Sequence, residues 1–112
     1  MDKFSVQSDV AGDVAVVTAS GRIDSETAPM LDAELVKISG VKNKIVIELK
    51  DVNYLSSAGL RAIVKSLQAV QKTGGGVRLA SASESVVTVL RTVGMMEMLK
   101  MYPSIADAVA GF

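Results

Sequence analysis

Two adjacent serines, Ser56 and Ser57, are the residues whose type and position point most directly to chemistry. They follow a stretch typical of a strand end and precede Gly59 and Leu60, where a helix is expected to begin. The first N–H groups of a helix have no partner within the helix and carry the positive end of its dipole, so they attract anions. A serine hydroxyl in this place could cap the helix, act as a nucleophile or accept a phosphate group.

The residue types that are missing remove one of these roles. The chain contains no histidine and no cysteine, which excludes a Ser-His-Asp triad, a Cys-His nucleophile pair and zinc sites of the usual Cys/His kind. We therefore expect a protein that is not an enzyme and that has no catalytic residue, metal or other cofactor. The fold also needs no disulfide, which agrees with the cytoplasmic location that we expect.

Charge and hydropathy limit the partners of the chain. Twelve basic and twelve acidic residues give a formal net charge of zero. Neither a basic stripe nor an acidic tail is visible, so nucleic acid is not an expected partner. The longest apolar runs are too short to cross a bilayer, and the first residues lack the apolar run of a signal peptide. We expect no membrane partner and a monomer when the protein is unbound.

The elements that position the serines are predicted from the spacing of apolar residues. Short β-branched or alternating runs predict strands at 4–8, 14–19, 44–49 and 77–80. Apolar residues at three- and four-residue intervals predict helices between Thr27 and Gly40, after Ser57 as far as Gly74, between Ser83 and Gly94, and from Pro103 to Val109. The predicted order is therefore β-β-α-β-α-β-α-α.

This order predicts an α/β fold in a single domain that spans residues 1–112, with a mostly parallel or mixed central sheet of about four to five strands. In open sheets of this kind, functional residues lie where the carboxyl ends of strands meet helix N-termini. Two such places exist, and we call Asp24–Thr27 the first elbow and Tyr54–Gly59 the second elbow. If their strands are neighbours, the two elbows lie side by side.

Both elbows carry sequence motifs with a family resemblance. The sequence of Gly21–Ala28, G-R-I-D-S-E-T-A, resembles the first signature of STAS domains of the anti-sigma factor antagonist type. The sequence of Asp51–Leu60, D-V-N-Y-L-S-S-A-G-L, resembles the second. The two motifs stand at the family's spacing, and the resemblance covers nearly the whole chain.

The resemblance implies a protein that switches between partners. The unmodified domain is expected to bind an anti-sigma factor that is also a serine kinase of the histidine-kinase-like ATPase fold, so that sigma factor is released. The kinase then phosphorylates one serine and releases the phosphorylated domain. A PP2C-type phosphatase removes the phosphate. The motif places the acceptor at Ser57. Ser56 is the second candidate, because it stands where the family often has Asp, and Asp24 matches the family's acidic residue near the acceptor.

The residues of the second elbow agree with a switch of this kind. They carry no charge between Tyr54 and Leu60, so a partner could bury them, and a phosphate of about −1.5 to −2 charges would disrupt such a contact. The Ser57 oxygen is also expected to cap the helix. We expect the partner-binding residues to be Asp24, Tyr54, Leu55, Ser56, Ala58, Gly59 and Arg61. For Asp24 a turn-forming role, and for Arg61 simple solvation, stay open.

Two other functions stay open. The domain could be a STAS adaptor subunit of a transporter or lipid-trafficking complex, which needs no phosphorylation. It could also bind nucleotides, since a helix N-terminus can hold a phosphate, although Gly74–Gly76 do not precede a helix with a Lys-Ser/Thr pair as a phosphate loop would.

Overall fold

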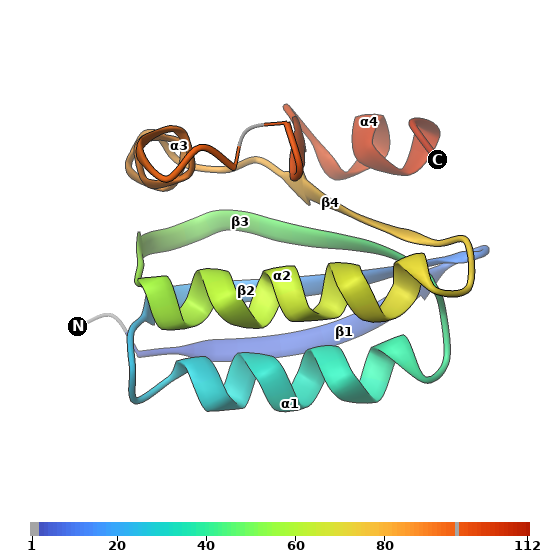
Figure 1. Cartoon of the computed structure of the whole chain (residues 1–112), viewed down its shortest axis with the longest axis horizontal. Helices are drawn as coiled ribbons and strands as arrows, with labels where there is room; N and C mark the ends of the chain where they lie inside the picture. Colours follow the sequence, from blue (N-terminus) through green and yellow to red (C-terminus); the bar gives the residue numbers. More distant parts are fainter. Residues whose placement is uncertain (1–2, 96) are drawn as a thin grey trace.

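The computed structural model describes residues 3–95 and 97–112. Strands and helices alternate after a first pair of strands (Figure 1). The strands are β1 (Ser5–Ala11), β2 (Val14–Ile23), β3 (Lys44–Leu55), β4 (Gly76–Ala80) and β5 (Lys100–Tyr102). The helices are α1 (Ala28–Ser39), α2 (Ser57–Gln71), α3 (Glu84–Thr92) and α4 (Ile105–Ala110). The observed order is β-β-α-β-α-β-α-β-α.

The strands form one mixed sheet in the order β1-β2-β3-β4-β5. β1 and β2 are an antiparallel hairpin, whereas the pairs β2–β3, β3–β4 and β4–β5 are parallel. A helix connects the two strands of each parallel pair, as such crossovers require. The predicted α/β class and the mixed sheet of four to five strands are confirmed.

The predicted order was wrong in one respect, because it lacked β5. This strand has three residues, Lys100–Tyr102. Three residues are too few to show the alternation by which a strand is predicted from sequence. The strand forms because its backbone pairs with Arg78–Ala80 at the edge of the sheet.

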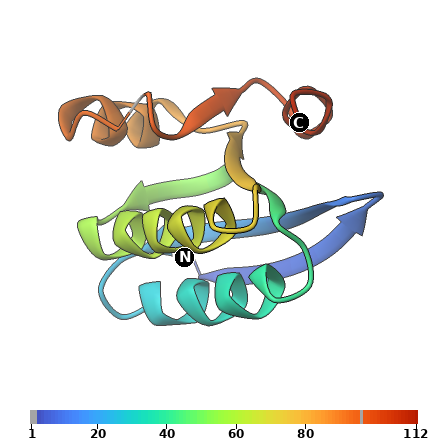
Figure 2. The same cartoon turned by 45° about the vertical axis from the view of Figure 1, so that its right-hand side comes forward.

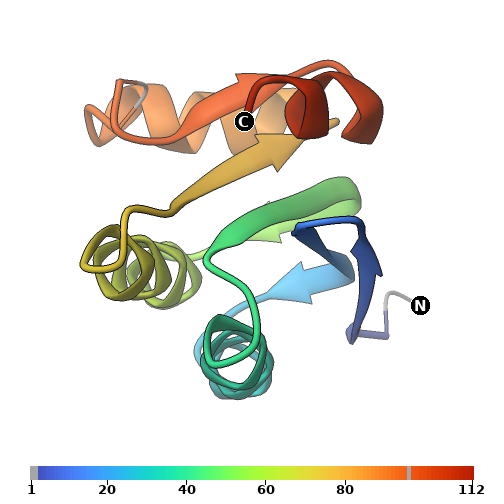
Figure 3. The ribbon, with the colours of Figure 1, turned by 90° about the vertical axis from the view of Figure 1, so that its right-hand side faces the viewer.

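Apolar side chains fill both faces of the sheet. The main core packs the inward residues of the strands against the apolar sides of α1, α2 and α3. A smaller cluster on the opposite face holds Val14, Val16, Val46 and Ala80 against Ala108 of α4. Figures 1 and 2 show α1 and α2 side by side, and Figure 3 shows α4 far from α1 across the sheet.

β2 and β3 are longer than their apolar runs predict, and the two elbows lie at their extended ends. β2 continues to Ile23 and β3 to Leu55, with register shifts between Thr18 and Ser20 and between Gly21 and Arg22. Gly21 has φ +90°, and a Cβ there would lie 2.8 Å from the backbone oxygen of Lys3. The irregular pairing therefore needs a glycine at this point.

The helices begin and end close to the predicted limits. Thr27 and Ser83 occupy the N-cap positions of α1 and α3, although neither side chain makes a capping hydrogen bond. Gly40 occupies the C-cap position of α1. In the part of the chain that the structure describes, no helix is both long and apolar enough to cross a membrane.

Candidate functional site

The second elbow places the two serines in different positions of α2. Ser56 is the N-cap residue, with extended backbone angles of φ −82° and ψ 168°. Its Oγ accepts a hydrogen bond from the N–H of Gly59 at 3.2 Å, and its backbone oxygen accepts one from Leu60 at 3.0 Å. Ser57 is the first residue of the helix. The expectation that Ser57 caps the helix was therefore wrong, because the chain leaves the strand one residue earlier.

The two hydroxyls also differ in exposure. Ser57 is exposed, and among the described residues its side chain makes no hydrogen bond. Ser56 is half-buried and is already engaged as the cap. A modifying enzyme can therefore reach the Ser57 hydroxyl without breaking a hydrogen bond of the fold. Modification of Ser56 would instead remove the N-cap hydrogen bond of α2.

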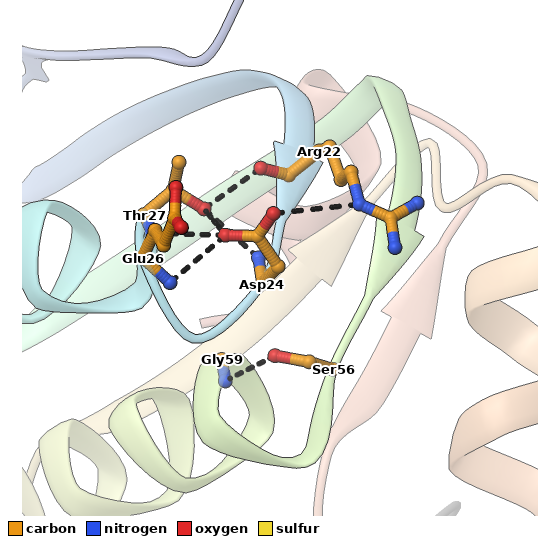
Figure 4. A network of polar contacts seen from close by, with 6 residues as sticks. All are labelled: Arg22, Asp24, Glu26, Thr27, Ser56 and Gly59. Atoms are coloured by element: carbon orange, nitrogen blue, oxygen red, sulfur yellow. Dashed lines mark hydrogen bonds and ion pairs between the residues drawn. The ribbon is translucent and has the colours of Figure 1, made fainter.

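The first elbow is a tight turn held by Asp24 (Figure 4). Its Oδ1 accepts hydrogen bonds from the N–H groups of Glu26 at 2.9 Å and Thr27 at 3.0 Å. The Thr27 Oγ1 accepts one from the N–H of Asp24 at 2.9 Å and donates one to the backbone oxygen of Arg22 at 2.8 Å. Asp24 thus has a structural role in the turn before α1, whatever it does towards a partner.

These contacts also change the pKa of the Asp24 carboxyl group. They hold its pKa below the ordinary value of 3.8, first because the Thr27 N–H donates to the carboxylate, while partial burial opposes this effect. The Glu26 N–H, the Thr27 hydroxyl and the Arg22 guanidinium lower the pKa further. The Asp24 carboxylate is therefore ionised at neutral pH.

Arg22 joins the two elbows. Its Nε lies 3.4 Å from Asp24 Oδ2, and its guanidinium lies 4.0 Å above the ring of Tyr54, which is 39% exposed. The sequence of the second elbow is uncharged, but a cation from the neighbouring strand covers its aromatic ring, that of Tyr54. A partner would therefore meet an ion pair and a cation–π contact at this surface.

The expectation that the elbows lie side by side is confirmed. Arg22 pairs with Tyr54 and Ile23 with Leu55 in the parallel ladder. The N–H of Ser56 also donates to the backbone oxygen of Ile23 at 2.8 Å. The first turn of α2 approaches this strand closely, because a Cβ on Gly59 would lie 2.4 Å from Cγ2 of Ile23.

Burial divides the predicted partner-binding residues into two groups. Leu55 is 2% exposed and Gly59 is buried, so neither is accessible in the unbound domain, and a direct contact with a partner stays a prediction for both. Both face the core, where they fix the shape of the elbow. The residues that remain exposed or half-buried are Asp24, Tyr54, Ser56, Ala58 and Arg61.

Comparison with known proteins decides the family. A model of the STAS domain matches residues 5–108. The chain belongs to the STAS domain family. The anti-sigma-B factor antagonist of Bacillus subtilis (strain 168) is 32% identical over 83 residues, which are 74% of this chain and 76% of that protein. The resemblance to anti-sigma factor antagonists is thereby confirmed.

Solved structures agree on the fold of this STAS domain. The crystal structure of an anti-sigma factor antagonist from Mycobacterium paratuberculosis superposes with a TM-score of 0.89 at 24% identity, over 97% of this chain and 93% of that one. That of TM1081 from Thermotoga maritima gives 0.87 at 25% identity, over 95% and 92%.

A groove that the sequence did not predict reaches the second elbow of this STAS domain at Ala58. It has a volume of about 330 Å³ and runs between the first halves of α1 and α2, and we call it the α1–α2 groove. Its lining consists of Ser25, Ala28, Pro29, Asp32, Ala58, Arg61, Ala62 and Lys65. A larger hollow of about 760 Å³ opens beside α4, and no residue of either elbow lines it. The α1–α2 groove is lined by Ser25 of the first elbow and Ala58 of the second, so it is the one that adjoins this site.

Proposed function

We propose that this STAS domain is an anti-sigma factor antagonist that is switched by phosphorylation of Ser57. In this proposal the unmodified domain binds an anti-sigma factor with serine kinase activity in the cytoplasm, and sigma factor is released. The observation that carries the proposal is the exposed Ser57 hydroxyl, which makes no hydrogen bond within the described residues, beside Ser56, which already caps α2. The name of the Bacillus subtilis relative supports the same function.

The chemical step would belong to the partner. The Ser57 oxygen would attack the γ-phosphorus of ATP in the kinase, the bond to the β-phosphate oxygen would break, and ADP would leave. Among the described residues no carboxylate is hydrogen-bonded to Ser57, so the base that takes the hydroxyl proton would come from the kinase. The domain supplies an acceptor and a docking surface, and in this proposal it is not an enzyme.

Phosphorylation would act on the interface and leave the fold intact. A dianion at the first residue of α2 is favoured by the helix dipole, by roughly 0.3–1 kcal/mol. In a desolvated contact beside the ionised Asp24, the same dianion would cost several kcal/mol of binding. A loss of about 4 kcal/mol weakens affinity on the order of a thousandfold. A PP2C-type phosphatase would restore the unmodified form.

Phosphorylation by a kinase of this class tests the proposal directly. Incubation with the cognate anti-sigma factor kinase and ATP should add one phosphate, detected by intact-protein mass spectrometry. Ser57→Ala should abolish the addition, and the matched variant Ser56→Ala should keep it. Undiminished phosphorylation of Ser57→Ala would contradict the proposed acceptor.

The competing functions give different results. Heat from the titration of ATP or GTP into the domain alone would favour nucleotide binding. Co-purification of the chain with a permease and its ATPase, without any phosphate on Ser57, would favour an adaptor subunit. The proposal expects neither result.

A further inference from the structure

Arg61 stands where it can reach a group attached to Ser57. It follows Ser57 by four residues on α2, and both residues are exposed. Residues four apart lie on the same face of a helix, with Cβ atoms about 5–6 Å apart. Helical side chains lean towards the N-terminus of their helix. The guanidinium of Arg61 can therefore extend over the turn that carries Ser57.

Arg61 is also available for a new partner. Within the ranges that the structure describes, it makes no ion pair and no contact with an aromatic ring. The other cations of this region are occupied. Arg22 contacts Asp24 and the ring of Tyr54, and Lys65 lies 3.2 Å from Asp32 across the groove.

We propose that Arg61 binds the phosphate of phosphorylated Ser57, so that phosphorylation neutralises a cation at the edge of the α1–α2 groove. The presence of this phosphate rests on the proposed function. An anion four residues before a cation is the more favourable order on a helix, and a guanidinium holds phosphate through two parallel N–H bonds.

The pairing has a consequence for the partner. In the unmodified domain Arg61 lines the groove beside Ala58 and Ala62. There its guanidinium can form an ion pair with the carboxylate of an acidic side chain of a bound protein. After phosphorylation the same guanidinium is bound to the phosphate of Ser57 within the domain. The phosphate then repels the partner and also removes the cation that the partner's carboxylate would use.

The nearby acidic groups do not compete for Arg61. Asp24 is held by the N–H groups of Glu26 and Thr27 and by Arg22. Asp32, which faces the groove from α1, is paired with Lys65. Among the described residues Arg61 makes no ion pair with any of these carboxylates or with Glu26, so a phosphate on Ser57 would be its first anionic partner.

The test uses the full chain with phosphoserine incorporated at position 57 during translation, so that no kinase is needed. Phosphorus NMR follows the second ionisation of the phosphate, whose usual pKa is about 6. Arg61→Gln should raise this pKa by roughly 0.2–0.4 pH unit, because the charged partner of the dianion is removed. Arg61→Lys, which keeps the charge, should restore part of the difference.

Two control variants identify the residue responsible. Lys72→Gln removes the same charge at the far end of α2 and should leave the titration unchanged. Arg22→Gln tests the cation at the end of β2, which is paired with Asp24. Identical titrations of the parent and Arg61→Gln, or a shift in Arg22→Gln alone, would overturn the proposal. A kinase that ignores Ser57 would instead refute the proposed function and leave this pairing untouched.

Discussion

At the scale of the residue, the two neighbouring hydroxyls of the second elbow have separate roles. Ser56 Oγ is bonded to the N–H of Gly59 and is half-buried, whereas Ser57 is exposed. Asp24 also has a structural role, since its carboxylate accepts the hydrogen bonds that hold the turn before α1. Ser56 and Asp24 thus hold the local geometry, whereas Ser57 and Arg61 are exposed and have no side-chain partner among the described residues.

Stability measurements should separate the two serines. Ser56→Ala should lower the free energy of unfolding by about 1 kcal/mol, because the N-cap hydrogen bond of α2 is lost. Ser57→Ala should change it by no more than about 0.5 kcal/mol, because an exposed side chain outside the hydrogen-bond network is removed. Urea denaturation of both variants measures the difference. A larger loss in Ser57→Ala would contradict the assignment of the cap.

Asp24 predicts a specific dependence of stability on pH. Its pKa in the folded state lies below the ordinary value of 3.8, so its ionisation stabilises the fold above that value, and this contribution disappears as the pH falls through the folded pKa. Asp24→Asn keeps an acceptor oxygen but cannot ionise. The stability advantage of the parent over Asp24→Asn should therefore shrink in denaturation experiments as the pH falls below 3.8 and through the lower pKa of the folded state. An advantage that is independent of pH would rule out this electrostatic contribution.

At the scale of the element, the elbows depend on how closely α2 approaches β2. The extended ends of β2 and β3 pair Ile23 with Leu55, and α2 begins directly after this pair. The first turn of α2 contains Gly59, which is buried. A small residue here brings the helix N-terminus, with its unpaired N–H groups, next to the first elbow.

Gly59→Ala tests this close approach. The added Cβ would lie 2.4 Å from Cγ2 of Ile23 and 2.8 Å from Cδ1 of Leu55. Overpacking of this kind costs about 1–3 kcal/mol, and the better helix propensity of alanine offsets at most about 1 kcal/mol. We expect a net loss of about 1–2 kcal/mol in thermal or chemical unfolding.

Gly40→Ala is the matched control for this variant. Gly40 has φ −76°, and a Cβ there would meet its nearest atom, the backbone oxygen of Lys37, at an ordinary 3.5 Å. It should change stability by less than about 0.5 kcal/mol. Equal effects of the two substitutions would show that the contact of Gly59 with β2 is not critical.

At the scale of the whole molecule, the parallel pairing of β2 with β3 brings together the two elbows, which are far apart in the sequence. Much of this arrangement was predictable from sequence. The apolar runs predicted the first four strands in their order along the chain, and the two motifs predicted the family. The N-cap position was not predictable, because either serine satisfies the same preference and the backbone angles decide between them. The contact of Arg22 with Tyr54 depends on strand register, and the groove depends on helix packing, neither of which a local pattern contains.

The affinity of the anti-sigma factor kinase for the two forms of this domain tests the central claim most directly. Isothermal titration calorimetry would compare the unmodified chain with the chain that carries phosphoserine at position 57, while circular dichroism verifies that both are folded. The account predicts that phosphorylation weakens binding on the order of a thousandfold, equivalent to about 4 kcal/mol, with an unchanged fold. Equal affinities of the two folded forms would contradict it.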